Sequence, residues 1–408
     1  MRDIDGLAQN SLVFDPATLN NNSNGEYDVW ELFGEVSLPI LQGVTFAEEL
    51  TVDAAARYSD YDTIGSTWTW SVGGSWSPWT DLRFRGTVSK AVRAPNIFEL
   101  FEPDQGAFFR PDDPCDQAVL DALNNPVREA TCRADGIPVG YNDPLSARFS
   151  GVVSGNEDLE EEEADTWTVG FVFTPDFFQG FTASVDYWNI EIDNAIEGVD
   201  DQDIVDNCYD STGFPNQFCD LFSRNRDDTS AQFLGFNFLR QTQLNFGSIE
   251  SEGVDFSTQY AFALGENDIL LSVGGSWVDN LDYYFDPADS SVVDPELGEI
   301  QRPEWAGNGM IEFRRGPLTA RWHTLYQDEQ ALRAVEIEDY QVNYGDAGIA
   351  SDVWVHDISG SWDFDERWQL YGGVNNLTDE EPFITEQAWP VNPRGRYFFL
   401  GVSYQGGL

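Results

Sequence analysis

The stretch from Thr80 to Leu100, TDLRFRGTVSKAVRAPNIFEL, decides the fold. Successive side chains of a strand point to opposite faces, so Leu82 and Phe84 share one face and Arg83 and Arg85 share the other. Two arginines in mid-strand are unusual for a soluble sheet. A wall with lipid on one side and a polar lumen on the other explains both faces. The stretch therefore predicts a strand of a transmembrane β-barrel, with Arg83 and Arg85 facing the lumen.

The spacing of the predicted strands supports a barrel. Pro95 ends the first strand, since proline cannot donate to a strand ladder. Connections then alternate between long loops and short turns, which is the pattern of an outer-membrane barrel. Residues 235–263 are predicted to be one long strand, because only this choice preserves the alternation. Long loops are expected at 94–163, 194–234, 281–303, 329–351 and 376–394, and short turns at 41–43, 264–267, 314–317 and 364–366.

Composition supports the same fold class and excludes others. Aromatic residues make up 14% of the 408 residues, which suits strands and interfacial aromatic bands. No apolar run approaches the roughly 18 residues of a transmembrane helix, so a membrane protein with this sequence must be a barrel. The net charge of −51 makes nucleic acid a poor partner. The acids gather in the predicted loops, where they form a solvated surface, a vestibule that attracts cations, or sites where divalent ions bridge to neighbouring lipopolysaccharide.

Four cysteines form two close pairs, both in long loops. Cys115 lies near Cys132, and Cys208 lies near Cys219. No CxxC or histidine-rich spacing suggests zinc, so two local disulfides in an oxidising compartment are the better interpretation.

The predicted fold is all-β, an antiparallel transmembrane barrel wall of about 13 strands. Residues 1–25 are polar and are expected to be a loop, and residues 26–408 are expected to form the wall with its loops. Single-chain bacterial barrels usually have an even number of strands, and no apolar signal segment follows Met1. We therefore expect the chain to be the C-terminal portion of a larger protein.

Four segments, in order, resemble signatures of TonB-dependent outer-membrane receptors. These are VSKAVRAPNIFELFEP at 88–103, GNEDLEEEEADTWTVG at 155–170, GSIESEGVDFSTQY at 247–260, and YGGVNNLTD at 371–379 with a final aromatic strand. Two departures stand out. Glutamates occupy 160–163 where the family usually has Lys-Pro-Glu, and Gln405-Gly406-Gly407-Leu408 follows the last aromatic residue, Tyr404.

The resemblance implies a receptor in the outer membrane that takes up a scarce nutrient and makes no covalent bond. The usual barrel of such receptors has roughly 22 strands, so about nine of its strands have no counterpart here. The N-terminal plug domain of the family has no counterpart here either. The TonB system would act through that missing plug, and lipid and lipopolysaccharide would surround the wall. Iron chelates, glycans, cobalamin and peptides are all candidate ligands. No cofactor, metal site or catalytic residue is predicted.

Several residues are candidates for contact with ligand or lumen. Aromatic side chains stack on rings and arginines hold anionic groups, although both also serve in ordinary loop packing. Arg93, Pro95 and Asn96 are interpreted as fixing the exit from strand to loop. The extracellular candidates are Phe108, Phe109, Arg110, Phe222, Arg224, Tyr283, Tyr284 and Trp389, and the lumenal candidates are Arg83, Arg85, Arg321 and His323.

Two alternatives remain open at this point. A passive porin-like barrel explains the alternation of loops but not four ordered signatures. A secreted acidic β-rich lectin would need polar outer faces, which the strands at 164–174 and 181–193 lack. A barrel often migrates anomalously on denaturing gels unless it is boiled, whereas a lectin would remain in the soluble fraction.

Overall fold

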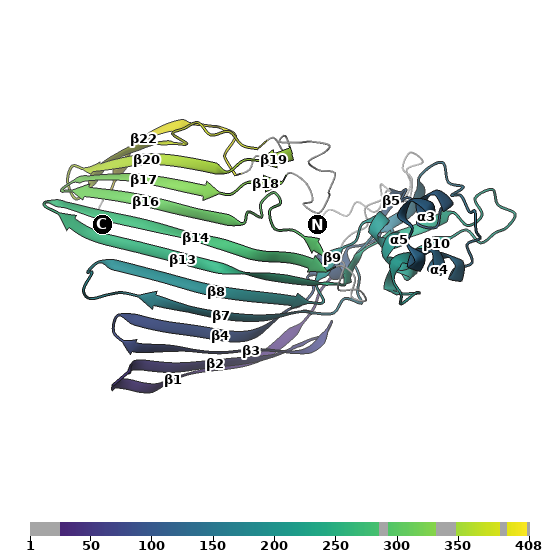
Figure 1. Ribbon diagram of the computed structural model, residues 1–408, viewed down its shortest axis with the longest axis horizontal. Coiled ribbons are helices and arrows are strands. Elements are labelled where there is room, and N and C mark those ends of the chain that lie inside the picture. The colour runs from purple at the N-terminus through teal and green to yellow at the C-terminus, as the bar shows by residue number, and fades with distance from the viewer. Residues whose placement is uncertain (1–24, 285–292, 332–347, 384–389, 406–408) are drawn as a thin grey trace.

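A curved antiparallel sheet forms the body of the molecule (Figure 1). The computed structural model describes residues 25–284, 293–331, 348–383 and 390–405. The sheet has 14 strands, of which β15 (Asp294–Pro295) pairs only with the end of β14. The others follow one another in chain order: β1 (Val29–Val44), β2 (Ala47–Tyr61), β3 (Gly65–Trp79), β4 (Leu82–Arg93), β7 (Glu162–Phe173), β8 (Phe181–Asp193), β13 (Ser248–Leu264), β14 (Asn267–Tyr284), β16 (Trp305–Arg315), β17 (Leu318–Gln327), β20 (Val353–Asp363), β21 (Trp368–Asn375) and β22 (Tyr397–Tyr404).

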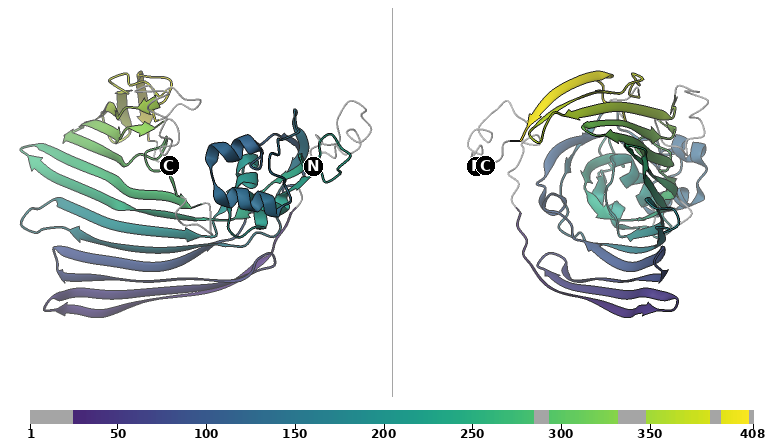
Figure 2. Two further views of the ribbon diagram at one scale, coloured as in Figure 1. Left: turned by 45° about the vertical axis from the view of Figure 1, so that its right-hand side comes forward. Right: turned by 90° about the vertical axis from the view of Figure 1, so that its left-hand side faces the viewer.

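The sheet is an open arc rather than a closed cylinder. Seen along the strands, it curves around a central space, and the yellow and purple ends of the arc stay apart (Figure 2). Within the described residues, β1 pairs with β2 and β22 pairs with β21, and neither has a second neighbour. We call this sheet the wall. Its short turns lie at one end and its long connections at the other, which in an outer-membrane barrel are the periplasmic and extracellular ends.

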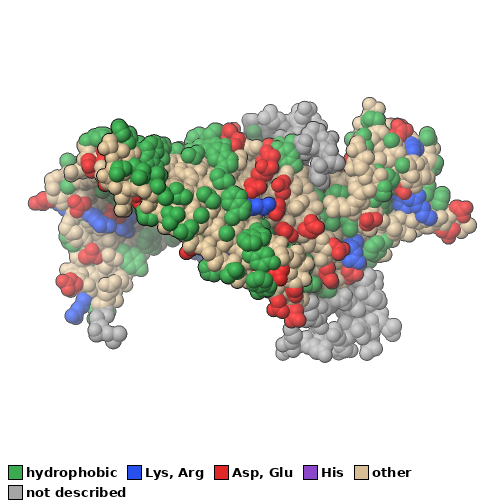
Figure 3. All heavy atoms as spheres, turned by 90° about the horizontal axis from the view of Figure 1, so that it is seen from below, with side chains coloured by type: hydrophobic (Ala, Val, Ile, Leu, Met, Phe, Trp, Pro, Cys, Tyr) green, Lys and Arg blue, Asp and Glu red, His purple; other side chains and the backbone are tan. Residues whose placement is uncertain are grey.

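The two faces of the wall differ in chemistry. Along β7, Trp167 and Val169 are exposed on the convex face, whereas Thr168 and Gly170 on the other face are partly covered. In Figure 3, hydrophobic side chains cover much of the wall and acidic ones gather towards the extracellular end. This is the division expected of a wall with lipid outside and a polar lumen inside. No helix in the described part of the chain has the length and apolar character needed to cross a membrane, which says nothing of a β-barrel.

Aromatic rings form bands near both ends of the wall. Near the extracellular end, Trp30 lies 5.2 Å from Tyr58, and Tyr326 lies 4.6 Å from Trp354, measured between ring centroids. Near the periplasmic end, further ring pairs join neighbouring strands or turns: Phe46 with Trp79, Trp76 with Phe84, Phe178 with Tyr260, and Trp368 with Tyr404. Tyrosine and tryptophan suit a membrane interface because one end of each side chain is apolar and the other is polar.

Two long connections fold together at the extracellular end into a compact unit, which we call the module. It consists of residues 97–153 and 196–246, and viewed along the strands it lies within the outline of the arc (Figure 2). Its elements are α2 (Ile97–Phe101), β5 (Gln105–Phe109), α3 (Gln117–Leu123), α4 (Pro126–Ala134), β6 (Phe149–Val153), β9 (Ile196–Gly198), α5 (Asp201–Asp210), η2 (Gln217–Leu221), β10 (Phe222–Arg224), β11 (Phe236–Gln241) and β12 (Gln243–Asn245). The strands pair in the order β10-β11-β6-β5, β12 pairs with β9, and a separate pair joins β18 (Gln330–Ala331) to β19 (Ile349–Ala350).

The module has its own hydrophobic core. Ile137 of the first connection and Ile204, Tyr209, Phe236 and Leu239 of the second are almost fully buried in this core. Burial of such side chains stabilises a fold by roughly 1.5–3 kcal/mol each. The core therefore depends on contacts between segments that are far apart in the sequence.

The structure corrects three expectations. The connections at 94–163 and 194–234 are not irregular loops but supply helices and strands to the module. The predicted strand 235–263 is wrong in its first half, because residues 236–245 form β11 and β12 of the module and the wall strand begins at Ser248. Long and short connections still alternate, because the long connection after β8 extends as far as Ser248. The first turn lies at 45–46 and not at 41–43, since β1 continues to Val44.

Candidate functional site

The lumenal arginines of β4 are held by carboxylates of other strands. Arg83 Nη2 lies 3.2 Å from Glu49 Oε2, and Arg85 makes two bonds to Asp186, from Nε at 2.7 Å and from Nη2 at 2.5 Å. In the ladder, Gly170 lies between Arg85 and Asp186. A Cβ atom at Gly170 would lie 2.2 Å from Asp186 Oδ1, so only glycine lets this carboxylate cross to the arginine. These pairs are half exposed, and such pairs contribute little to stability.

A third lumenal pair lies further along the wall, on β16 and β17. Arg321 on β17 donates to Glu312 on β16, whose side chain is nearly buried. His323 lies two residues after Arg321 on β17, so the two share the lumenal face, and His323 is opposite Asp357 of β20 in the ladder. The arginines on the lumenal face are therefore already paired with acidic side chains.

The exit from β4 is fixed by a charge cluster. The Arg93 guanidinium donates to Glu99 at 3.0 Å and also to Glu162 at the start of β7. Asn96 caps helix α2, with its side-chain oxygen accepting from the Phe98 and Glu99 backbone N–H groups. Arg93 and Asn96 therefore fix the path of the chain from the wall into the module, as their positions in the sequence predicted. We call the region where chain segments connect the wall to the module the neck.

Three predicted ligand contacts belong to the core of the module instead. Phe109 is 6% exposed, and Phe222 packs edge-on against Phe236. Arg224 is buried, and its guanidinium makes a paired contact with Asp113 at 2.6 and 2.8 Å. The expectation of surface contact is wrong for Phe109 and Arg224, because aromatic rings and a neutralised arginine serve equally well to fill a core.

The Arg224–Asp113 pair is completely satisfied by its surroundings. Arg224 also donates to the Tyr209 hydroxyl at 2.8 Å and to the Leu234 carbonyl at 2.9 Å. Asp113 accepts from the Tyr141 hydroxyl at 3.1 Å and from the Cys115 backbone N–H at 2.9 Å. Burial, followed by the charge of Asp113, raises the pKa of Tyr141. Breaking such a pair leaves an uncompensated buried charge, which costs about 3–5 kcal/mol.

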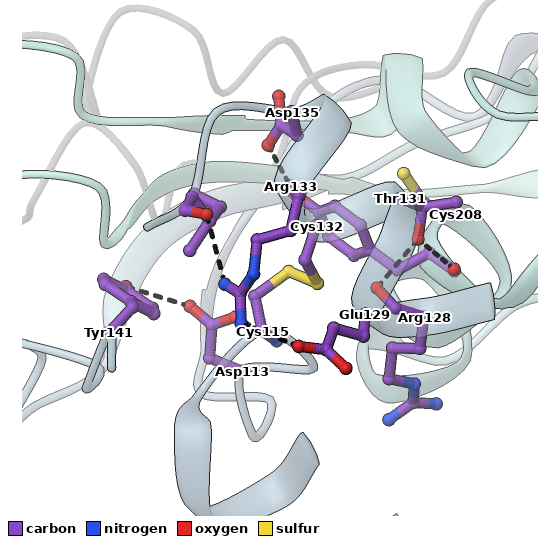
Figure 4. The surroundings of a disulfide bond; sticks show 12 residues. Asp113, Cys115, Arg128, Glu129, Thr131, Cys132, Arg133, Asp135, Tyr141 and Cys208 are labelled. Atoms are coloured by element: carbon purple, nitrogen blue, oxygen red, sulfur yellow. Dashed lines mark hydrogen bonds and ion pairs between the residues drawn. A yellow bond between two sulfur atoms is a disulfide. The ribbon is translucent and has the colours of Figure 1, made fainter. Parts of the chain in front are cut away.

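Both predicted disulfides are present. Cys115 is bonded to Cys132 and Cys208 to Cys219. Figure 4 shows the Cys115–Cys132 bond beside Asp113, with the Tyr141 hydroxyl directed at the Asp113 carboxylate. The first bond joins the segment before α3 to helix α4, and the second joins α5 to η2. The two bonds therefore fasten the core from both connections.

The other extracellular candidates lie in different places. Phe108 is 48% exposed on the module. Arg110 is held by Asp143 at 2.9 Å and by the Leu145 carbonyl. Tyr283 and Tyr284 lie at the end of β14, and Tyr284 donates to Glu250. Trp389 lies outside the described residues. Of the extracellular set, the structure brings Phe108, Phe109, Arg110, Phe222 and Arg224 together in the module.

A cavity of about 860 Å³ lies at the neck, where four chain segments connect wall and module. Its lining is polar and acidic, with one guanidinium from Arg240. The other charged and amide side chains are Glu102, Asp104, Asn156, Glu157, Asp158, Glu160, Asn194, Gln217, Asp220 and Asn245. Sequence reasoning missed this site, because its residues come from several separate elements and connections and none stands out alone. In the described part of the chain, no group of three or more His, Cys, Asp and Glu side chains is placed to hold a metal ion.

Burial also affects acids next to the neck. Glu197 on β9 has a raised pKa, caused first by burial and then by the nearby charge of Glu162. Asp206 on α5 has a raised pKa because of burial, opposed by the charge of Arg128.

Comparison with known proteins agrees with this architecture. The model of the TonB dependent receptor-like β-barrel family matches residues 2–377. The sequence has no significant match among the curated proteins. A mutant of the ferric enterobactin receptor PfeA of Pseudomonas aeruginosa, solved with enterobactin, is similar in structure with a TM-score of 0.61 at 15% identity.

Two further solved structures are similar. The siderophore receptor PirA of Acinetobacter baumannii has a TM-score of 0.60 at 14% identity, over 95% of this chain and 49% of that one. The FrpB iron transporter of Neisseria meningitidis has a TM-score of 0.52 at 15% identity, over 93% and 45%. The match to PfeA likewise covers 93% of this chain and 45% of the other. This chain thus spans about half the length of the structures it matches.

The identities are too low for these structures to show more than the fold. The family model, in contrast, covers most of the chain. This chain belongs to the β-barrel family of the TonB-dependent receptors, which reside in the outer membrane.

Proposed function

We propose that the chain supplies the wall and the extracellular module of an outer-membrane receptor for TonB-coupled uptake of a scarce nutrient. One observation carries the proposal: a folded, disulfide-bonded module lies over the mouth of a wall whose lumenal face is polar and whose outer face is apolar. A passive pore needs no such module. The nutrient would be an iron chelate, a glycan, cobalamin or a peptide.

The open arc limits how the barrel is completed. Strands β1 and β22 are the first and last of thirteen antiparallel strands in order, so they run in the same direction. A closed, fully antiparallel barrel therefore requires an odd number of additional strands between them. Roughly nine would complete a 22-stranded barrel. We propose that such strands, and the plug on which TonB acts, complete the working receptor.

The lumenal face suits contact with a plug rather than free diffusion. Its arginines are paired with Glu49, Asp186 and Glu312, so the face offers acids and neutralised cations instead of a uniformly basic path. Among the proteins of similar structure, PirA is a siderophore receptor and FrpB is an iron transporter, and those functions belong to those proteins. Lipid and lipopolysaccharide are the partners that the apolar outer face and the acidic extracellular end would meet.

Gene disruption in the native host tests the proposal. Uptake of labelled ferric chelates, oligosaccharides, cobalamin and peptides is measured with and without a protonophore, and a complemented strain is the control. We expect the disrupted strain to lose saturable, protonophore-sensitive uptake of one nutrient class. Unchanged uptake of every nutrient, or loss of only protonophore-insensitive diffusion, would contradict the proposal.

A further inference from the structure

The outer face of the four-stranded module sheet carries a slot between two aromatic rings. Phe108 of β5 is opposite Ser150 of β6 in the ladder. The parallel pairing of β11 with β6 joins Arg240 to Val152, and two residues back along both strands it places Phe238 beside Ser150. Phe108 and Phe238 therefore stand on one face with a small serine between them.

Both rings are accessible and unstacked. Phe108 is 48% exposed and Phe238 is 37% exposed, and Ser150 is also exposed. Their sequence neighbours Phe109 and Leu239 point into the core. Among the described residues, neither ring packs against another aromatic side chain, unlike Phe222 and Phe236 on the inner face.

The dimensions of the slot fit one ring. Neighbouring strands lie 4.7–4.9 Å apart, so the two phenylalanines are separated by roughly 9–10 Å at their backbones. A ring inserted between them needs about 3.5–4.0 Å on each side to make van der Waals contact. The separation therefore accommodates one planar or chair-shaped ring, with the Ser150 side chain as the floor.

Polar groups surround the slot. On the far side of Phe238, Ser223 donates to Asn237 Oδ1 at 2.6 Å, which leaves the Asn237 amide nitrogen available. On the same face, two residues along from Phe238, Arg240 is held by Asp104 and by Ser154. Both Arg240 and Asp104 also line the neck cavity, so the cavity begins two residues along β11 from Phe238.

The charge of this surface selects the ligand. The cavity lining has six carboxylates, Glu102, Asp104, Glu157, Asp158, Glu160 and Asp220, against the single guanidinium of Arg240. Arg240 is already neutralised by Asp104 at 2.7 Å. An anionic chelate would meet repulsion, whereas carboxylates and amides are good partners for hydroxyl groups.

We infer that the slot formed by Phe108, Ser150 and Phe238 holds one ring of a neutral saccharide, whose further units extend into the neck cavity. Stacking on both phenyl faces gives binding, and carboxylate and amide groups accept and donate hydrogen bonds to the hydroxyls. This inference rests on the proposed receptor function and names its ligand class. It leaves the transport step to the complete receptor.

Binding by the full chain, folded in detergent, tests this inference. The probes are immobilised maltoheptaose, cellohexaose, xylohexaose and mannohexaose, with ferric enterobactin as the anionic contrast. We expect one saccharide to bind, and the double variant Phe108→Ala/Phe238→Ala to bind it at least about tenfold more weakly. Ser150→Trp, which fills the slot from an exposed position, should abolish binding.

A matched variant controls for general effects. Phe177 is 83% exposed at the turn between β7 and β8, at the opposite end of the wall. Phe177→Ala should leave saccharide binding unchanged, and near-ultraviolet circular dichroism should show that all variants are folded. Absence of binding to every saccharide, or binding unaffected by the slot variants, overturns the inference.

Failure of the inference and failure of the proposed function give different results. If ferric enterobactin binds and saccharides do not, the ligand class is wrong but the receptor function stands. If neither probe binds and gene disruption leaves all uptake unchanged, both are wrong.

Discussion

The environment of a residue is determined differently in the wall and in the module, and this difference explains which parts of the protein can be predicted from its sequence. In the wall, each residue's environment follows from its parity along a strand, as Val169 and Thr168 illustrate by facing opposite sides. In the module, environment follows from contacts between distant segments, as when Arg224 meets Asp113, 111 residues away. A local pattern therefore determines the wall, and a hydrophobic core determines the module.

The largest expected effect is on the core of the module. Arg224→Ala should destabilise the module by about 3–5 kcal/mol, because Asp113 would remain buried without its partner. Limited proteolysis of the folded chain should then cut within 97–153 and 196–246 while the wall strands stay protected.

Arg226→Ala is the matched control for this variant. Arg226 lies two residues away and pairs with Asp135 at 2.6 Å, but its side chain is 49% exposed. Its loss should cost less than about 1 kcal/mol. Equal protease sensitivity of the two variants would contradict the claim that the fold of the module depends on its buried core.

The next effect concerns the outer face of the wall. Val169→Arg should cost roughly 2–4 kcal/mol of folding free energy in lipid vesicles, because the charge would face hydrocarbon near the middle of β7. Urea titration of the chain folded into vesicles measures this cost.

Thr168→Arg, one residue earlier, tests the parity of the same strand. Thr168 faces the polar lumenal side, so this variant should cost much less. A reversed order of the two costs would mean that the faces are assigned wrongly.

A comparable effect is expected from the first disulfide. Replacing Cys115 and Cys132 by serine opens a link that spans 17 residues, and a loop of this size contributes about 3 kcal/mol in the chain-entropy account. Thermal unfolding followed by fluorescence should show a lower transition for the module and an unchanged one for the wall. A single, equally lowered transition would show that the two regions unfold together.

The smallest effect is the pH dependence of the neck. Burial raises the pKa of Glu197 above its ordinary value of 4.5, so folding favours its protonated form. The resulting stabilisation is fully present below pH 4.5 and is lost as pH rises through the raised value. Glu197→Gln should therefore flatten this part of the profile and raise stability at neutral pH, where the wild-type carboxylate must ionise in a partly buried position. A profile that keeps its slope in this variant would assign the dependence to other groups.

The sequence predicted the wall well for a physical reason. Period-two alternation is a local pattern, so the residues from Leu82 to Ser89 predicted which side chains share each face of β4 without reference to the neighbouring strands. The disulfides were also predictable, since the cysteines are close in sequence. Arg93 was predicted to fix the exit from strand to loop, but its partners Glu99 and Glu162 were not predicted.

The site was less predictable because it depends on packing. Phe108 and Phe109 look equivalent in sequence, yet one is exposed and the other is buried in the module core. Residues 236–241 have the composition of a wall strand and do form a strand, but in the sheet of the module. Which ring faces solvent is decided by pairing between strands that are distant in sequence, since β5 and β11 both pair with β6. The neck cavity was missed for the same reason.

Thiol labelling on intact cells tests the central claim most directly. All four cysteines are in disulfides, so a single introduced cysteine is the only free thiol. Val139→Cys lies on the module, where Val139 is 78% exposed, and Phe177→Cys lies at a short turn of the wall. A membrane-impermeant maleimide should label Val139→Cys in intact cells, and should label Phe177→Cys only after the outer membrane is permeabilised. The reverse pattern, or equal labelling of both in intact cells, would contradict a membrane-embedded wall with an extracellular module.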